Sequence, residues 1–129
     1  PALEKALDDP ELDVRDEAVN ALIEHQSAAT LPVVENMFAR DDAWYHREAV
    51  GVLELIPDTR AVDLIVDTAL ESPDAETREA AETFLQERSG RRFVFAHEWR
   101  TWWNETKAAA PADTDDDTWD EWWQEIRKH

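Results

Sequence analysis

Apolar residues recur at helical spacing in three similar blocks within the first 89 residues. Each block follows an acidic turn such as Asp9-Pro10, and it places a small and a larger apolar residue four positions apart, on one face of a helix. The blocks repeat with a period of about 31 residues, which is typical of stacked helical repeats. The aligned positions are Ala18, Ala49 and Ala80, followed by Leu22, Leu53 and Phe84.

A second apolar pattern follows each of the first two blocks. Thr30 and Asp58 are typical N-cap residues, and we expect each of them to begin a helix. Pro10 and Pro73 are expected just inside helix N-termini, where the missing N–H has no cost, and Gly90 is expected to end the third long helix. The sequence therefore predicts helix–turn–helix units. The inward faces of the second helices comprise Leu31, Val34, Met37 and Phe38, and then Val62, Ile65, Val66, Ala69 and Leu70.

Six of the seven tryptophans form two copies of the pattern Trp-x-x-Trp-Trp near the C-terminus. The three rings of a copy share one side of a helix, so each copy predicts a short amphipathic helix with a heavy apolar face. One ring can bury about 150–250 Å². Each triplet must therefore pack against the rest of the chain or against a partner. The copies are Trp99, Trp102 and Trp103, and then Trp119, Trp122 and Trp123.

The first Trp triplet is interpreted as a helix that covers the last hydrophobic face of the repeat stack, together with Phe93 and Phe95. An aromatic shelf for a sugar or a peptide is the alternative. Residues 108–117 predict an acidic linker, and Thr118 with Glu121 predicts a capping box for a last helix. The expected organisation is a repeat domain with its cap helix over 1–107, the linker over 108–117 and a Trp-rich helix over 118–129.

The second Trp triplet has two open interpretations. Folded back, its helix extends the stack by one helix pair, and this packing on the same domain is favoured. Swinging free, the helix docks into a groove of another protein or of a second copy. Trp119, Trp122 and Trp123 are therefore candidate partner-binding residues.

The chain carries a formal charge of −18, from 31 acidic and 13 basic residues. Nucleic acid and anionic membranes are poor partners, because both require a cationic surface. Few of the basic residues are lysines, and an acidic, lysine-poor surface is typical of salt-adapted proteins; a docking surface for a cationic partner is the alternative. The chain has no cysteine, which excludes disulfides and thiol chemistry. It begins at Pro1 without an initiator Met, so we expect a piece of a longer protein. Targeting signals then cannot be judged, and the cytoplasm is the favoured location.

No catalytic, cofactor-binding or metal-binding residue is predicted. The four histidines are scattered, and the sequence has no Ser/His/Asp grouping or phosphate-binding loop. Asp113, Asp115 and Asp117 alternate as in a calcium loop, but Thr118 and Gln124 stand where such a loop needs Gly and Glu. We therefore expect a protein that is not an enzyme and that holds no cofactor.

The order Asp-Pro, Val-Arg, Ala, Ala-Leu between Asp9 and Leu22 resembles HEAT repeats, in particular the HEAT-like class of the phycobilisome lyases. The segment from Ser89 to Trp103 resembles a Trp-rich tail that follows such repeats in bacterial proteins. The resemblance implies a right-handed α–α solenoid whose second helices line a concave face. Their polar sides would present the partner-binding candidates Glu35, Asn36, Arg60, Asp63 and Asp67.

The sequence thus predicts an all-α solenoid of HEAT-like repeats with Trp-rich C-terminal capping helices. Its expected role is that of a non-catalytic scaffold or protein–protein interaction module, whose partner is another protein with a cationic surface. Self-association through the last helix is a further option. Two alternatives stay open: a carbohydrate- or small-ligand-binding module that uses surface tryptophans, and an accessory helical domain of a larger enzyme.

Overall fold

The computed structural model describes residues 2–25, 28–111 and 115–128, and most of these residues are helical. No β-strand occurs among them, and the all-α solenoid class is confirmed. Three short 3-10 helices, η1 (Ala28–Thr30), η2 (Ala69–Glu71) and η3 (Lys107–Ala109), adjoin the α-helices. The α-helices in the described ranges are α1 (Ala2–Leu7), α2 (Leu12–His25), α3 (Leu31–Phe38), α4 (Ala43–Leu53), α5 (Thr59–Asp67), α6 (Ala75–Ser89), α7 (Ala96–Thr106) and α8 (Asp116–Lys128).

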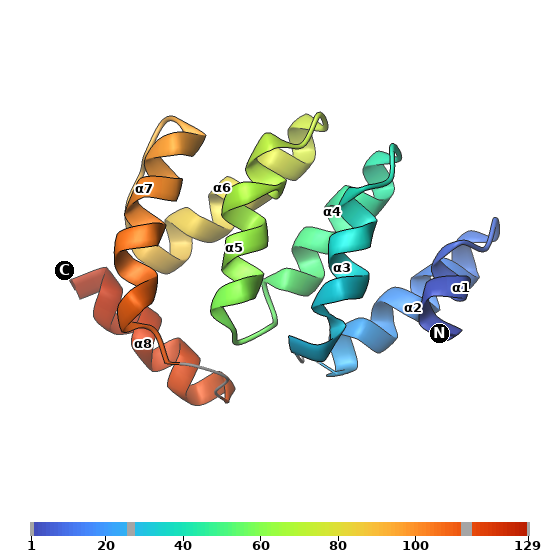
Figure 1. Ribbon diagram of the computed structural model, residues 1–129, viewed down its shortest axis with the longest axis horizontal. Coiled ribbons are helices and arrows are strands. Elements are labelled where there is room, and N and C mark those ends of the chain that lie inside the picture. The colour runs from blue at the N-terminus through green and yellow to red at the C-terminus, as the bar shows by residue number, and fades with distance from the viewer. Residues whose placement is uncertain (1, 26–27, 112–114, 129) are drawn as a thin grey trace.

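The helices stand as successive pairs along the long axis of the molecule, in two layers (Figure 1). The layer that faces the viewer contains α3, α5 and α7, in which α3 contacts α5 and α5 contacts α7. The layer behind contains α2, α4 and α6, which also contact their neighbours in order. α8 packs on α6, so the last two helices continue the two layers beyond the third repeat.

The core between the layers is built from the periodic apolar positions, with one shift of phase. Ala18 and Ala49 are 3% and 0% exposed, but in the third repeat Ala81 is buried at 0% in place of the aligned Ala80. The reason lies in the helix start. Asp42 caps α4 and Asp74 caps α6, and the buried alanine follows each cap at the same distance along the helix. The cap therefore sets which residues face inward, because a helix turns by a constant angle per residue.

Aspartate side chains begin the helices after the short turns. The Asp42 carboxylate accepts a hydrogen bond from Trp44 N–H at 2.9 Å, and the Asp58 carboxylate accepts one from Arg60 N–H at 2.8 Å. Burial by itself raises the pKa of Asp58, but hydrogen bonds from Arg60 and its positive charge hold that pKa below the ordinary value. The expected cap at Asp58 is confirmed, since its oxygen satisfies one of the open N–H groups of α5.

Of three other expected helix starts, α3 does begin directly after Thr30, whereas Pro10 and Pro73 lie outside their helices. Thr30 precedes α3, but its side chain makes no capping hydrogen bond, because η1 already leads into the helix with helical backbone angles. Pro73 lies before the cap Asp74 and outside α6, and Pro10 lies before α2. Asp74 is the better cap, because its carboxylate accepts from both Thr77 N–H and Thr77 Oγ1–H. The expected end at Gly90 is confirmed by its left-handed φ of 72°.

The last helix begins earlier than the expected capping box at Thr118. α8 starts at Asp116, and the Asp115 carboxylate accepts a hydrogen bond from Thr118 N–H at 2.7 Å. That hydrogen bond lowers the pKa of Asp115. Asp is a stronger N-cap than Thr, and Asp116 and Asp117 are favoured in the first turn by the helix dipole. Thr118 is thus inside the helix, and the calcium-loop comparison at Asp113 lies outside the described residues.

Candidate functional site

The two Trp triplets pack against each other between α7 and α8. The Trp103 and Trp123 rings are stacked at 5.9 Å with an angle of 13° between their planes, and Trp102 lies 6.4 Å from Trp123. Trp119 meets Trp123 edge to face at 5.9 Å. Such offset and edge-to-face contacts add to the stabilisation from burial itself. Trp99, Trp103, Trp119 and Trp123 are 1%, 1%, 3% and 1% exposed.

The Trp cluster also closes the end of the repeat stack. Trp123 lies edge to face on Phe84 of α6 at 6.3 Å, and Phe93 lies edge to face on Trp99 at 4.8 Å. Arg88 of α6 forms an ion pair with Asp120 of α8 at 2.7 Å. In this arrangement Trp119 and Trp123 are not accessible to a partner, and of the second triplet only Trp122 is half-buried.

One polar contact joins the Trp cluster to the second repeat. Trp103 Nε1–H donates to the Asp63 carboxylate at 2.7 Å, and Lys107 Nζ lies 3.2 Å from the same oxygen. Trp99 and Trp123, by contrast, have indole N–H groups with no hydrogen-bond partner among the described residues. The partly exposed Asp63 side chain therefore links α5 to α7 by a hydrogen bond.

A hollow lined by several of the candidate residues lies between α3 and α5. Its volume is about 520 Å³. Three of the five polar candidates line it, Glu35 from α3 and Arg60 and Asp63 from α5. Apolar side chains supply the rest of the lining, so the hollow combines apolar and charged surface. The lining residues are Ala29, Leu31, Pro32, Glu35, Arg60, Asp63 and Leu64.

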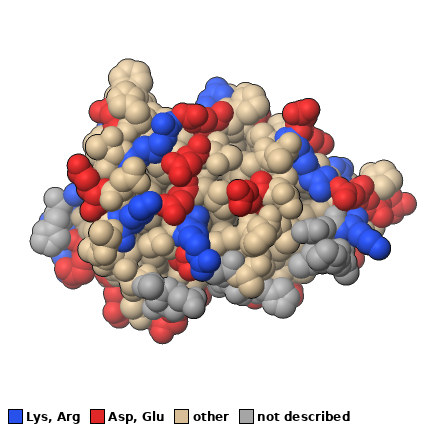
Figure 2. Space-filling view, in the orientation of Figure 1, with Lys and Arg blue, Asp and Glu red and all other residues tan. Residues whose placement is uncertain are grey.

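The charged side chains that line this hollow differ in whether they already bind other residues of the chain. Arg60 pairs with Asp58 through two hydrogen bonds, at 3.0 and 3.1 Å, and Asp63 holds Trp103 and Lys107. Glu35 is exposed and has no ion pair within the described ranges. Figure 2 shows acidic and basic side chains interleaved over this face. Among the charged side chains that line the hollow, the Glu35 carboxylate is therefore the one without an ion pair in the described ranges, and apolar side chains line the same hollow.

The other two polar candidates lie elsewhere. Asn36 lines a separate hollow of about 420 Å³, shared with Leu7 and Arg40. Asp67 is exposed near the end of α5 and lines none of these hollows. The structure thus brings together Glu35, Arg60 and Asp63, and leaves Asn36 and Asp67 apart.

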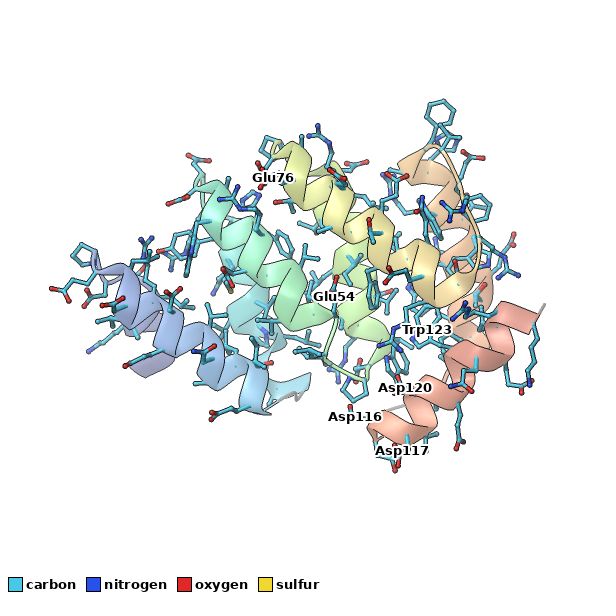
Figure 3. The ribbon with its side chains drawn as sticks, turned by 180° about the vertical axis from the view of Figure 1, so that it is seen from behind. Glu54, Glu76, Asp116, Asp117, Asp120 and Trp123 are labelled. Atoms are coloured by element: carbon cyan, nitrogen blue, oxygen red, sulfur yellow. The ribbon has the colours of Figure 1, made fainter. Side chains whose placement is uncertain are left out.

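A charged cluster that no sequence pattern predicts lies where the end of α4 meets α6. Burial, and then the carboxylate of Glu87, raises the pKa of Glu54, while Arg88 opposes that rise. Figure 3 shows Glu54 on the same side of the molecule as Asp120 and Trp123 of α8. Glu54 is the first residue after α4 and belongs to no recurring sequence pattern. Only the position of α6 reveals its environment.

Three further observations describe this structure. No group of three or more potential metal-ligating side chains gathers in the described part of the chain. None of the helices in that part is both long and apolar enough to cross a bilayer. The remaining features, namely stacked helix pairs, Asp-capped turns and an apolar hollow between neighbouring second helices, define a helical repeat protein.

The family model for HEAT repeats matches residues 1–86, which is well over half of the chain. The chain therefore belongs to the HEAT-repeat family. No curated protein and no solved structure matches it. The family match ends before Trp99, so the likeness to the phycobilisome lyases and to a Trp-rich tail stays a prediction. Proteins with HEAT repeats are generally scaffolds or protein-interaction modules and typically lack catalytic activity.

Proposed function

We propose that this domain is a non-catalytic interaction module that binds a segment of another protein in the hollow between α3 and α5. The observation that carries the proposal is the meeting of an apolar lining with the uncommitted carboxylate of Glu35. Leu31, Pro32 and Leu64 would accept an apolar side chain of the partner. Glu35 would accept hydrogen bonds from a cationic one.

The charge of the chain supports a cationic partner. A net charge of −18 attracts basic proteins over a distance of about one Debye length, which is close to 10 Å at moderate salt. The same charge opposes nucleic acid and anionic membranes. Salt adaptation of the whole surface also explains the excess of acidic over basic residues. The binding site is therefore located with variants of single residues.

The two alternatives receive less support from the arrangement of side chains. A carbohydrate-binding surface needs exposed aromatic rings, whereas four of the seven tryptophans are at most 3% exposed. An accessory role in a larger enzyme depends on a catalytic part outside this chain. That role is compatible with binding in the hollow, because an accessory helical domain also has to contact another protein or domain.

Two charge-reversing variants test the proposal, Glu35→Arg in the hollow and Asp67→Arg outside it. Both residues are exposed and lie on neighbouring helices of one layer, and each substitution changes the net charge by the same amount. The immobilised full chain would be used to isolate basic proteins from an extract of the source cells, and one purified partner would then be titrated calorimetrically. Glu35→Arg is expected to weaken binding by about tenfold or more, and Asp67→Arg by less than about threefold.

Equal losses from both variants would show that binding depends on overall charge and would contradict a role for the hollow. Unchanged binding by Glu35→Arg would contradict it as well. Thermal unfolding of each variant serves as the control for folding, since exposed substitutions normally change stability by less than about 0.5 kcal/mol.

A further inference from the structure

A second hollow, of about 500 Å³, lies beside α8 and apart from the groove between α3 and α5. On one side of it, α8 presents residues spaced three or four apart, which therefore share a helix face. On the other side lie the last residue of η3 and the turn that follows it. The residues that line this hollow are Ala109, Pro111, Thr118, Glu121, Trp122, Gln124 and Glu125.

Trp122 differs from the other two rings of its triplet. Trp119 and Trp123 are buried, whereas Trp122 is half-buried and lines the hollow. Trp119 stacks on Trp122 at 5.5 Å, and Trp103 and Trp123 meet it at 6.0 and 5.0 Å. The ring is therefore held in place by three other indoles while part of its surface remains open.

Two carboxylates line the same hollow as Trp122. Glu125 is paired with Lys128 at 3.1 Å, whereas Glu121 is exposed and makes no ion pair among the described residues. The surface of an indole ring attracts cations through its quadrupole, and a carboxylate beside it adds a direct charge and hydrogen-bond acceptor. Trp122 and Glu121 together thus have the chemistry of a site for a cation.

The chain itself shows which cation suits its aromatic rings. The Arg15 guanidinium lies over Trp44 at 4.7 Å, and the Arg91 guanidinium lies over Trp102 at 5.3 Å. Within the described ranges no arginine or lysine lies over Trp122. A planar guanidinium can stack on the ring and donate two hydrogen bonds to a carboxylate at once, which an ammonium group cannot do.

We propose that the Trp122 hollow binds the side chain of an arginine exposed on a partner protein. The guanidinium stacks on Trp122 and donates hydrogen bonds to the Glu121 carboxylate. This site does not depend on the α3–α5 groove, so a partner can use it whether or not the groove is occupied.

The test titrates the isotope-labelled full chain with a capped Gly-Arg-Gly tripeptide and follows the indole N–H signals by NMR. The Trp122 signal is identified by its disappearance in Trp122→Phe. A capped tripeptide with citrulline in place of arginine is the neutral control, since citrulline keeps the shape and loses the charge. The arginine peptide is expected to shift the Trp122 signal to saturation, and the citrulline peptide is expected to leave it nearly unchanged.

Two further variants locate the binding. Glu121→Gln should raise the dissociation constant of the arginine peptide by about threefold or more, whereas Glu35→Gln, which removes the same charge in the α3–α5 groove, should leave it unchanged. Trp122→Leu keeps an apolar side chain without the aromatic quadrupole, but it also removes the reporting indole. Binding to this variant is therefore followed by the backbone amide signal of Glu121, whose saturable shift in the parent chain should be abolished. Because Glu121 is exposed, its variant stays informative even if Trp122→Leu lowers stability.

Three results would overturn the proposal: equal shifts with the citrulline peptide, equal losses from Glu121→Gln and Glu35→Gln, or no response of the Trp122 signal. The second result would mean that the peptide follows only the overall negative charge. Loss of binding at the α3–α5 groove would leave this test unaffected, since its readout is the Trp122 indole.

Discussion

The repeats up to α6 and the closing pair α7–α8 bury their apolar surface in different ways. In the repeats, small and branched side chains such as Ala49, Val50 and Ile65 lie between two helix layers at 0–1% exposure. In the closing pair, a few large rings fill the space between the helices, and Trp103 and Trp123 are both 1% exposed. Rings in contact replace the interdigitating rows of an ordinary helix interface.

The difference follows from position in the stack. An internal repeat is covered on both sides by similar repeats, so modest side chains suffice and the pattern recurs. The third repeat is followed by α7 and α8 instead of a similar repeat, and these helices cover its apolar face with larger side chains. This also explains why the HEAT-repeat match covers residues 1–86 and ends before the Trp triplets, whose composition departs from the repeat.

The largest expected effect comes from ending the chain at Lys107. The loss of α8 would expose Phe84, Trp102 and Trp103 and remove the burial of Trp119 and Trp123. We expect the free energy of unfolding to fall by about 5 kcal/mol and the melting temperature by roughly 15 °C, measured by urea and thermal unfolding in low and high KCl.

Removal of the first eight residues is the matched control at the other end. This removal takes away Leu7, which is 1% exposed, so the free energy of unfolding is expected to fall by about 2–3 kcal/mol. If instead the chain ending at Lys107 melts like the full chain, and the full chain self-associates, α8 is a docking element and its packing on α6 contributes little in solution.

An intermediate effect is expected from Asp63→Ala, which breaks one of the polar contacts between the two regions. The buried Trp103 N–H loses its acceptor, and an unsatisfied buried donor costs about 1–3 kcal/mol. Asp67→Ala, an exposed site on the same helix, should change the free energy of unfolding by less than about 0.5 kcal/mol. Equal effects in urea unfolding would mean that the hydrogen bond to Trp103 adds nothing.

The smallest effect is expected from Glu54→Gln, where α4 meets α6. Burial raises the pKa of Glu54 in the folded protein above its ordinary value of 4.5, so its charged form destabilises the fold at neutral pH. The variant should melt above the parent at pH 7, and the gain should shrink as the pH falls through the folded pKa and vanish below 4.5. Glu79→Gln, an exposed change on α6, controls for net charge; an equal gain there would contradict the role of burial.

Local patterns were sufficient for the repeats but not for the details of their phase. The periodic apolar positions predicted the stacked helices, and Asp58 and Gly90 were recognised as helix ends from their residue types alone. The alignment nevertheless pointed to Ala80, whereas the cap at Asp74 turns Ala81 inward. Thr118 begins a familiar capping motif, but Asp115 caps the helix three residues earlier, because its carboxylate accepts a hydrogen bond from Thr118 N–H.

The candidate site shows the same division. The resemblance to HEAT repeats implied that Glu35, Arg60 and Asp63 lie on the polar sides of two second helices, but only the α3–α5 contact brings them to one hollow. The bond from Trp103 to Asp63 joins residues that are 40 positions apart, and no local pattern predicts such a distant partner.

What the sequence by itself determined is the class of the protein: an all-α stack of HEAT repeats, because period, capping and turn residues act over a few neighbours along the chain. The tertiary structure decided how the two identical Trp patterns are used. α8 docks on α6 and α7 with Trp119 and Trp123 inward, and this leaves Trp122 as the half-exposed ring of its triplet. Three tryptophans with the same chemistry differ in role because burial depends on which distant surface each one meets.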